Sequence, residues 1–365
     1  MGQDLSVRVL QRDFTDPLAA PDVDYSVKGY AWNVIGGPDW AEIEVTGLAP
    51  ALWELIEMLR CPVEILNPRG ERRWWGLLSS VDLGIGNVQV GVSLETMANR
   101  IAVAYSLVEP GSSTVGARAT TSWAQNDDSV ATYGTKELLA SISGATTASA
   151  EQLRATLLAQ KRYPIPNVSF NPGGGDLKAN LRCLGWWSTL DWKTYLQTGK
   201  VSTETTAQIA AIVTAAGQFL TSTQIDTASG ISSSQYRDGD TTALAEIEDL
   251  LRTGTTNSRR LLATVTAERL LRVTEEPVSG PNDYLLLSDG SLHDGFDVPL
   301  LPDACTVGVW ARMKDVIPAT VDVSKLANPS PVFIEAAEYD AEKMIWKPQP
   351  RGVPSVWEMS SQIGE

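Results

Sequence analysis

Residues 48–94 change from a helical to an alternating pattern of hydrophobic positions. In residues 48–61 apolar side chains recur every three or four residues, and a proline stands where a helix start tolerates one. The apolar residues with this spacing are Leu52, Leu55, Ile56 and Leu59. Residues 62–78 then alternate around an Asn-Pro-Arg-Gly turn, and residues 81–94 around a Gly-Asn pair. The pattern predicts a short amphipathic helix and two β-hairpins, a unit that closes easily into a small barrel.

Three alternating runs precede this helix. They cover residues 5–10, 25–35 and 40–46, and each runs into turn-forming residues. In the third run Ile43 and Val45 alternate with glutamates, so one face of the predicted strand is apolar and the other faces water. The N-terminal part of the chain therefore predicts antiparallel β-structure.

The middle of the chain predicts helices. Helical spacing of apolar residues covers residues 121–139, 148–163, 203–220 and 240–251. The first of these is interrupted near Gly134, and the fourth begins with capping residues at its N-terminus. Residues 230–240 are polar and predict a loop.

Extended segments surround these helices. The predicted strands are residues 168–170, 177–184, 259–266, 269–273, 284–287, 298–302, 306–313 and 332–340. Two of them, 259–266 and 269–273, are close enough to form another hairpin. Residues 346–365 are rich in proline and predict an extended C-terminal tail that leaves the domain to reach a neighbour.

Composition narrows the class of protein. The chain has 365 residues, 43% hydrophobic and 20% charged, which suits two or three packed domains. Its formal net charge of −15 repels nucleic-acid phosphates, so a dedicated DNA-binding role is disfavoured. The N-terminus lacks a basic segment followed by an apolar run, and no run of about 18 apolar residues occurs. We therefore expect a soluble protein without an export signal or membrane anchor.

Residues that carry common enzymatic chemistry are scarce. Cys61, Cys183 and Cys305 are scattered, which favours free thiols over disulfides or a metal knuckle. His293 is the single histidine, so zinc sites with two histidines on one helix are excluded. The glycines at residues 173–175 are not followed by Lys-Ser or Lys-Thr and form no phosphate-binding loop. We predict no catalytic residue, no cofactor and no metal.

Two tryptophan pairs are the candidate functional residues. Trp74 and Trp75 stand in a predicted strand, where successive side chains point to opposite faces, so one of the two faces outward. The outer side chain is either covered by a second layer of the same chain or lies in a subunit interface, where aromatic residues are enriched. Trp186 and Trp187 raise the same alternatives. All four are candidate subunit-interface residues.

Six segments spread over most of the chain carry a resemblance. They are residues 50–55, 60–65, 75–77, 90–100, 185–192 and 333–340. In this order they resemble the tail hub family of tailed bacteriophages. That family includes the baseplate hub of contractile tails and the shorter tail-associated hub proteins of siphophages.

The resemblance implies an α+β, mainly β fold with two barrels like those of tail-tube proteins and two inserted or peripheral α/β domains. The implied domains are residues 1–110 (first barrel), 111–197 (outer α+β domain), 198–238 plus 298–345 (discontinuous second barrel), 239–297 (inserted peripheral domain) and 346–365 (extended tail).

The implied function is structural and not enzymatic. Three subunits would form a homotrimer at the distal end of the tail tube, present a pseudo-sixfold ring to the hexameric tube, and leave a channel for DNA. The implied partners are the tail tube and distal tail proteins, the tape-measure protein, and tail fibre or spike proteins. The protein would be made in the bacterial cytoplasm and located at the virion tail tip. An acidic channel suits DNA passage, because it does not bind phosphates.

Two alternatives stay open. The first is the distal tail protein of the same assembly, which forms a hexameric ring. The second is a carbohydrate-binding or glycan-cleaving protein, in which exposed tryptophans stack on sugars and two carboxylates such as Glu335 and Glu338 act on the glycosidic bond. Because the chain is rich in acids, such pairs are inevitable, which favours the interpretation of these glutamates as solvated surface residues.

Overall fold

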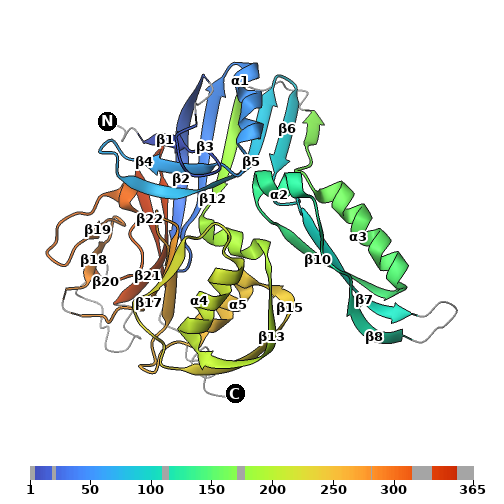
Figure 1. The fold of residues 1–365 in the computed structure, drawn as a ribbon. Helices are drawn as coiled ribbons and strands as arrows, with labels where there is room; N and C mark the ends of the chain where they lie inside the picture. The colour runs from blue at the N-terminus through green and yellow to red at the C-terminus, as the bar shows by residue number, and fades with distance from the viewer. Residues whose placement is uncertain are drawn as a thin grey trace.

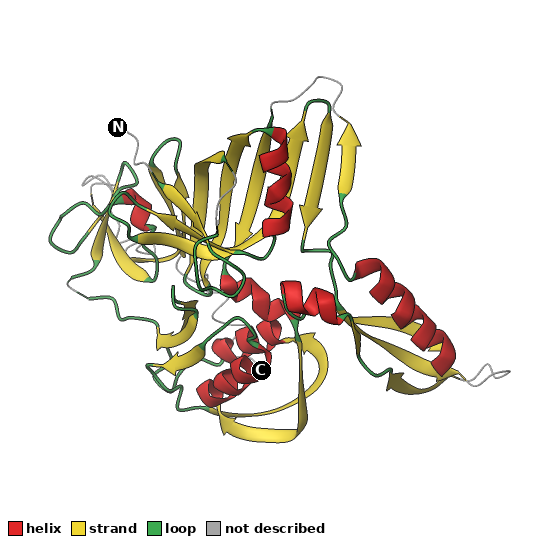
Figure 2. Cartoon of the chain, turned by 45° about the horizontal axis from the view of Figure 1, so that its top comes forward, coloured by secondary structure: helices red, strands yellow, loops and turns green. Residues whose placement is uncertain are grey.

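The computed structural model describes residues 5–18, 22–108, 115–170, 177–280, 282–314 and 331–351. Strands dominate this part of the chain (Figure 1), which confirms the mainly β fold. The largest element is one curled sheet shaped like half of a barrel, with helices and smaller sheets beside and below it (Figure 2). The division into two separate tube-like barrels stays a prediction.

The main sheet joins segments from both ends of the chain. Its strand order is β1 (Ser6–Val9), β4 (Pro62–Leu66), β5 (Arg72–Ile85), β12 (Lys178–Leu184), β3 (Gly37–Gly47), β2 (Val23–Asn33), β21 (Val332–Asp340), β20 (Val309–Lys314), β18 (Tyr284–Leu287) and β19 (Leu292–His293). β6 (Val88–Ser93) pairs with β5, β11 (Asn167–Phe170) pairs with β6, and β22 (Ile345–Arg351) pairs with β21. β2 runs antiparallel to β21, with Gly29 opposite Asp340. Segments assigned by sequence to two different barrels thus lie side by side in one sheet.

The predicted helix and hairpins of residues 48–94 are confirmed. α1 (Ala49–Glu54) continues as a 3-10 turn, η1 (Leu55–Met58), and its core-facing leucines are buried. β4 pairs with β5, and β5 pairs with β6, as two antiparallel hairpins. The second hairpin turns at Gly86, whose φ is +60°. Glycine adopts this backbone conformation without steric cost, which is why a Gly-Asn pair signals the turn.

A separate arm extends to one side of the main sheet (right in Figure 1). It consists of β7 (Arg100–Val108), β8 (Val115–Thr120), β9 (Ala124–Gln125), α2 (Asp127–Tyr133), β10 (Glu137–Ala145) and α3 (Thr147–Lys161). α3 confirms the helix predicted over residues 148–163. The helix predicted over residues 121–139 is wrong after Gly134, because the next segment is the strand β10. β10 lies parallel to the largely buried strand β7, and this pairing outweighs the helix-forming tendency of its leucines.

The lower body contains two helices and two small sheets. Its elements are η2 (Trp186–Trp192), β13 (Thr194–Glu204), α4 (Thr205–Ala216), β14 (Ser222–Ile225), β15 (Ser232–Thr242), α5 (Ala243–Arg252), β16 (Leu261–Val265) and β17 (Leu270–Glu275). The helices α4 and α5 and the hairpin of β16 and β17 confirm their predictions. The loop predicted over residues 230–240 is wrong. These polar residues form most of β15, which pairs antiparallel with β13.

The end of the described chain returns to the main sheet. β22 holds the first residues of the predicted tail against β21, and residues 352–365 lie outside the described residues. A 3-10 turn, η3 (Pro302–Ala304), contacts β22. Cys61, Cys183 and Cys305 are free, as predicted, and all three are buried. Among the described residues, no helix combines the length and the apolar character needed to cross a membrane.

Gly185 gives a first prediction. A Cβ atom at this residue would lie 1.8 Å from the backbone carbonyl oxygen of Pro38, although the φ of −65° accepts any side chain. Gly185→Ala should therefore lower the free energy of unfolding in urea by about 1–3 kcal/mol or more, because the junction of β12 and η2 must move away from β3. Gly280→Ala is the matched control, since no atom of a described residue other than its neighbours in sequence lies within 4 Å of the place that its Cβ atom would take. Equal stability of the two variants would contradict the prediction.

Glu204 gives a second prediction. Its carboxylate caps α4, accepting hydrogen bonds from the Ala207 amide at 2.9 Å and the Ser229 amide at 2.7 Å. Burial raises its pKa, but hydrogen bonds from Ser229, Thr206 and Ala207 outweigh burial and lower the pKa to about 2. The stabilisation is therefore complete above the ordinary pKa of 4.5 and is lost as the pH falls towards 2.

Glu204→Gln should accordingly lower the stability by about 1–2 kcal/mol at pH 7. The difference from the wild type should shrink as urea unfolding is repeated from pH 5 towards pH 2. The control is Glu151→Gln on the exposed face of α3, which should change the stability little at pH 7. A Glu204→Gln effect that stays constant over this pH range would disprove the capping role.

Candidate interaction surface

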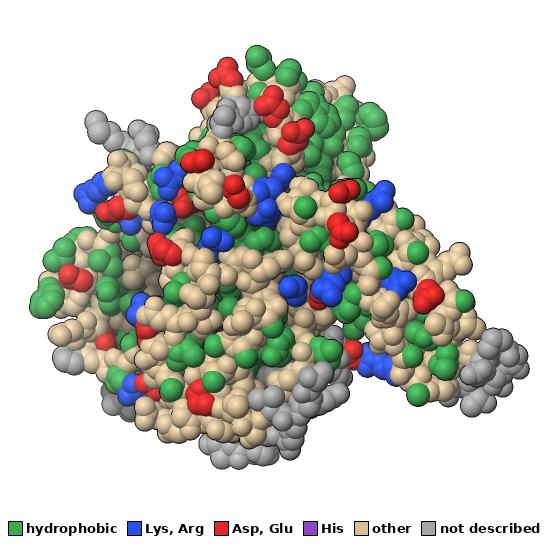
Figure 3. Space-filling model, viewed as in Figure 1, with side chains coloured by type: hydrophobic (Ala, Val, Ile, Leu, Met, Phe, Trp, Pro, Cys, Tyr) green, Lys and Arg blue, Asp and Glu red, His purple; other side chains and the backbone are tan. Residues whose placement is uncertain are grey.

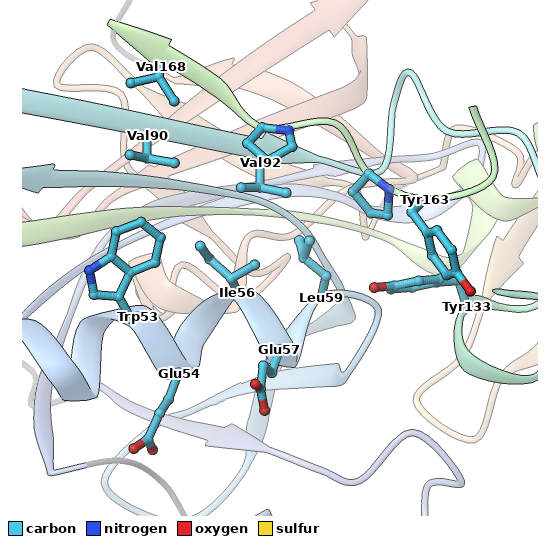
Figure 4. A pocket seen from close by; sticks show the side chains of 12 residues that line it. Trp53, Glu54, Ile56, Glu57, Leu59, Val90, Val92, Tyr133, Tyr163 and Val168 are labelled. Atoms are coloured by element: carbon cyan, nitrogen blue, oxygen red, sulfur yellow. The ribbon is translucent and has the colours of Figure 1, made fainter. Parts of the chain in front are cut away.

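An apolar groove of about 740 Å³ lies between α1, β6 and β11 (Figure 4). Its apolar lining includes Trp53, Ile56, Val90, Val92, Tyr163 and Val168. Figure 3 shows hydrophobic side chains gathered at the top of the molecule, over α1 and the strands next to it, with acidic side chains beside them. Contiguous apolar surface on a protein commonly marks a site of interaction. We call the groove and the exposed apolar residues of α1, η1, β6 and β11 around it the α1–β11 surface.

The register of α1 places a tryptophan on this surface. Leu52 and Leu55 are fully buried on the core side of the helix. Trp53, the next residue after Leu52, is turned by about 100° around the helix axis and is 46% exposed. Figure 4 shows Trp53 and Ile56 directed towards the strands, whereas Glu54 and Glu57 point away from them. The helix therefore contributes an apolar wall with an acidic rim.

β11 continues the apolar face of β6. Val168 lies opposite Val90, and Phe170 lies opposite Val88. Residues directly opposite in an antiparallel pair share one face of the sheet. Val90 is buried, but Val168 is 53% exposed and Phe170 is 77% exposed. The apolar face of the main sheet thus continues onto β11, where its side chains are exposed.

Two tyrosines close one end of the groove. Tyr133 lies beside Tyr163 in Figure 4, and the guanidinium carbon of Arg12 is 5.4 Å from the centre of the Tyr133 ring. Arg12 also donates a hydrogen bond to the backbone carbonyl of Glu57, which fixes it between η1 and α2. Burial raises the pKa of Tyr133, with Arg12 opposing this effect. This end of the groove is therefore a fixed aromatic wall with a neutral phenol.

The first tryptophan pair lies inside the chain. Trp74 has no exposed surface, and Trp75 is partly buried. The indole N–H of Trp75 donates to the carbonyl oxygen of Val265 at 3.1 Å, and its ring meets Trp32 edge to face with 4.8 Å between ring centres. β16 of the same chain thus covers the outer tryptophan, which was one of the two alternatives for this pair.

The second tryptophan pair is also buried. Trp186 packs against Phe14 and Phe219, with ring centres 5.2 Å and 5.8 Å apart. Trp187 lies against Gly36, where a Cβ atom would come within 2.9 Å of its ring. A subunit-interface role for Trp74, Trp75, Trp186 and Trp187 stays a prediction, and Trp75 retains the largest uncovered part of the four.

The carboxylates considered for glycan chemistry are held in ion pairs. Glu335 pairs with Arg260 and lies 3.6 Å from Arg351. Glu338 pairs with Lys347 at 3.0 Å. These ion pairs connect β21 to neighbouring segments, so a structural role accounts for both glutamates. Within the described residues, no group of three or more His, Cys, Asp and Glu side chains is placed to hold a metal ion.

Sequence reasoning missed the α1–β11 surface. The helix over residues 48–61 and the strand over residues 168–170 were both predicted, but nothing in either segment shows that they meet. The available signal was the pair Val168 and Phe170 in a short strand beside a glycine-rich stretch. Glycines have no side chains, so such a stretch offers little that could cover the apolar residues of the strand.

No protein-family model matches the chain. No curated protein matches it either. Among solved structures, it is similar to the crystal structure of the prophage MuSo2 43 kDa tail protein from Shewanella oneidensis, with 8% sequence identity, a TM-score of 0.41 and 92% of each chain covered. A likeness at this level carries no conclusion about function.

Proposed function

We propose that this chain is a structural protein of a bacteriophage tail and forms a trimeric hub at the distal end of the tail tube. The proposal rests on the six sequence segments that resemble the tail hub family. The mainly β fold is consistent with it. The single structural observation that supports it best is the incomplete curl of the main sheet.

The main sheet has open ends. Among the described strands, β1, β11, β19 and β22 each end a branch of the sheet, and no pairing joins them into a closed barrel. A closed barrel has no edges to share, whereas curled open sheets from several copies can be arranged around an axis to line a ring. Three such copies would leave a central channel, and a net charge of −15 would favour a channel that DNA passes without binding.

The proposed partners follow from this position. They are the tail tube and distal tail proteins on one side, the tape-measure protein in the channel, and tail fibre or spike proteins on the other side. The protein would be located at the virion tail tip.

The test is the mass of the purified protein in solution, measured by light scattering over a range of concentrations. We expect a particle near three times the 39.4 kDa of one chain, either alone or when the protein is mixed with tail tubes. A hexamer would contradict the hub and favour the distal tail ring. A monomer under both conditions would contradict both ring-forming functions.

The carbohydrate alternative has less support. Within the described residues, Trp53 is the one tryptophan with more than a third of its surface exposed, so the tryptophan pairs offer no sugar-stacking platform. Release of reducing sugar from bacterial wall or capsule, lost in Glu335→Gln, would nevertheless restore this alternative.

A further inference from the structure

We propose that the α1–β11 surface is a docking site for an extended segment of another protein. The segment adds to the main sheet as a new strand beside β11. It carries apolar side chains at alternate positions and Lys or Arg at its ends. The inference does not depend on the hub function, because it concerns one surface of the folded chain.

The free edge of β11 determines the conformation of the occupant. β11 pairs with β6 along one side. On its other side, no described residue forms a backbone hydrogen bond with Asn167–Phe170. A row of unsatisfied N–H and C=O groups is complementary to a second extended backbone, which is the basis of strand addition in peptide recognition.

The side chains of β11 determine the pattern of the occupant. All four residues of the strand are exposed, and Val168 and Phe170 stand on the same face. An added strand would place every second side chain beside these two residues, over the groove formed with Trp53 and Ile56. Apolar residues at those positions would bury surface that the single chain leaves in water.

Another outer strand of the sheet, β22, lacks these features. β22 contains Pro348 and Pro350, which have no N–H to donate, and Lys347 and Arg351, whose charges resist the approach of another strand. β11 contains neither proline nor charge. Edge strands are normally protected in one of these ways, so the apolar edge of β11, which no described strand covers, points to a partner that covers it.

The charge around the groove determines the ends of the occupant. Glu54 and Glu57 are exposed at its rim, and among the described residues that line it there is no Lys or Arg. A segment with basic ends is therefore favoured over an acidic one. The last residues of this chain include Glu358 and Glu365 and no cation, so they are poorly suited as the occupant.

The test uses a dye-labelled synthetic peptide in which valine alternates with threonine between terminal lysines. Fluorescence anisotropy should report saturable binding to the full chain. Phe170→Lys should weaken binding by about tenfold or more, since it places a charge on the edge strand. Phe296→Lys is the matched control, because this phenylalanine is similarly exposed in a loop after β19 and should leave binding unchanged.

Two further peptides separate the contributions of backbone and charge. Methylating alternate backbone nitrogens on the edge that would face β11 should abolish binding, because the added strand loses its donors. Replacing the lysines with glutamates should weaken binding, and Glu54→Gln with Glu57→Gln should reduce that difference.

Three results would overturn the proposal. The first is equal binding by the wild type and Phe170→Lys. The second is binding of the N-methylated peptide that is as tight as binding of the unmethylated peptide. The third is self-association of the wild type that Phe170→Lys abolishes in light scattering while Phe296→Lys does not, since the surface would then be occupied by a second copy of this chain.

Discussion

Trp74→Ala is expected to lower the free energy of unfolding by about 3–5 kcal/mol, among the largest losses available to a single core substitution. Trp74 has no exposed surface and lies in β5, opposite Ile65 of β4. Its ring occupies the space above Gly76, where a Cβ atom would come within 2.5 Å of the ring. β5 is paired with β4 on one side and with β12 on the other, so we expect removal of the ring to leave a cavity.

Urea unfolding of Trp74→Ala and two comparison variants tests this expectation. Trp53→Ala removes the same side chain from an exposed position and should change the stability by less than about 1 kcal/mol. Trp74→Phe should cost less than Trp74→Ala, because it fills part of the space and the indole N–H has no hydrogen-bond partner within the described residues. If Trp74→Ala and Trp53→Ala were equally stable, the position of Trp74 in the core would be wrong.

Arg73→Ala is expected to have a similarly large effect, about 3–5 kcal/mol, for an electrostatic reason. Arg73 on β5 donates through Nε to Oδ2 of Asp303 at 2.8 Å. The Asp303 side chain is almost completely buried in η3. Removal of the guanidinium would leave a buried carboxylate without its cation, and this penalty exceeds the modest value of an exposed ion pair.

The controls for this prediction separate charge from packing. Arg252→Ala breaks an exposed pair with Asp249 on α5 and should change the stability by about 0.5 kcal/mol or less. Combining Arg73→Ala with Asp303→Asn should recover part of the loss, because the second change removes the unpaired charge. A loss for Arg73→Ala no larger than that for Arg252→Ala would show that Asp303 does not need its partner.

This ion pair also illustrates a limit of sequence reasoning. Arg73 and Asp303 are 230 positions apart, and neither stands in a motif. The same holds for the hydrogen bond from Trp75 to Val265 and for the pairing of β2 with β21. The candidate interface role of the tryptophan pairs was reasoned from strand geometry. The layer that covers Trp75 comes from β16, which no local pattern connects to β5.

Elements whose signal is local could be predicted from the sequence. The amphipathic spacing of residues 48–61, the Gly-Asn turn at Gly86 and the capped helix α5 each depend on neighbours within a few residues, so their patterns survive in the sequence. The mainly β character followed from the same alternation of apolar and polar residues.

Which elements meet, and which side chains stay uncovered, depends on contacts between segments that lie far apart in the chain. The leucines of β10 form a strand because β7 offers a buried edge, and polar β15 is a strand because β13 lies beside it. Distant partners also decide which side chains are covered. Trp75 is covered because β16 lies against it, whereas Val168 and Phe170 are exposed. The backbone hydrogen bonds of a strand are made with partners that are distant in the chain, and a local sequence pattern does not indicate which segments those partners are.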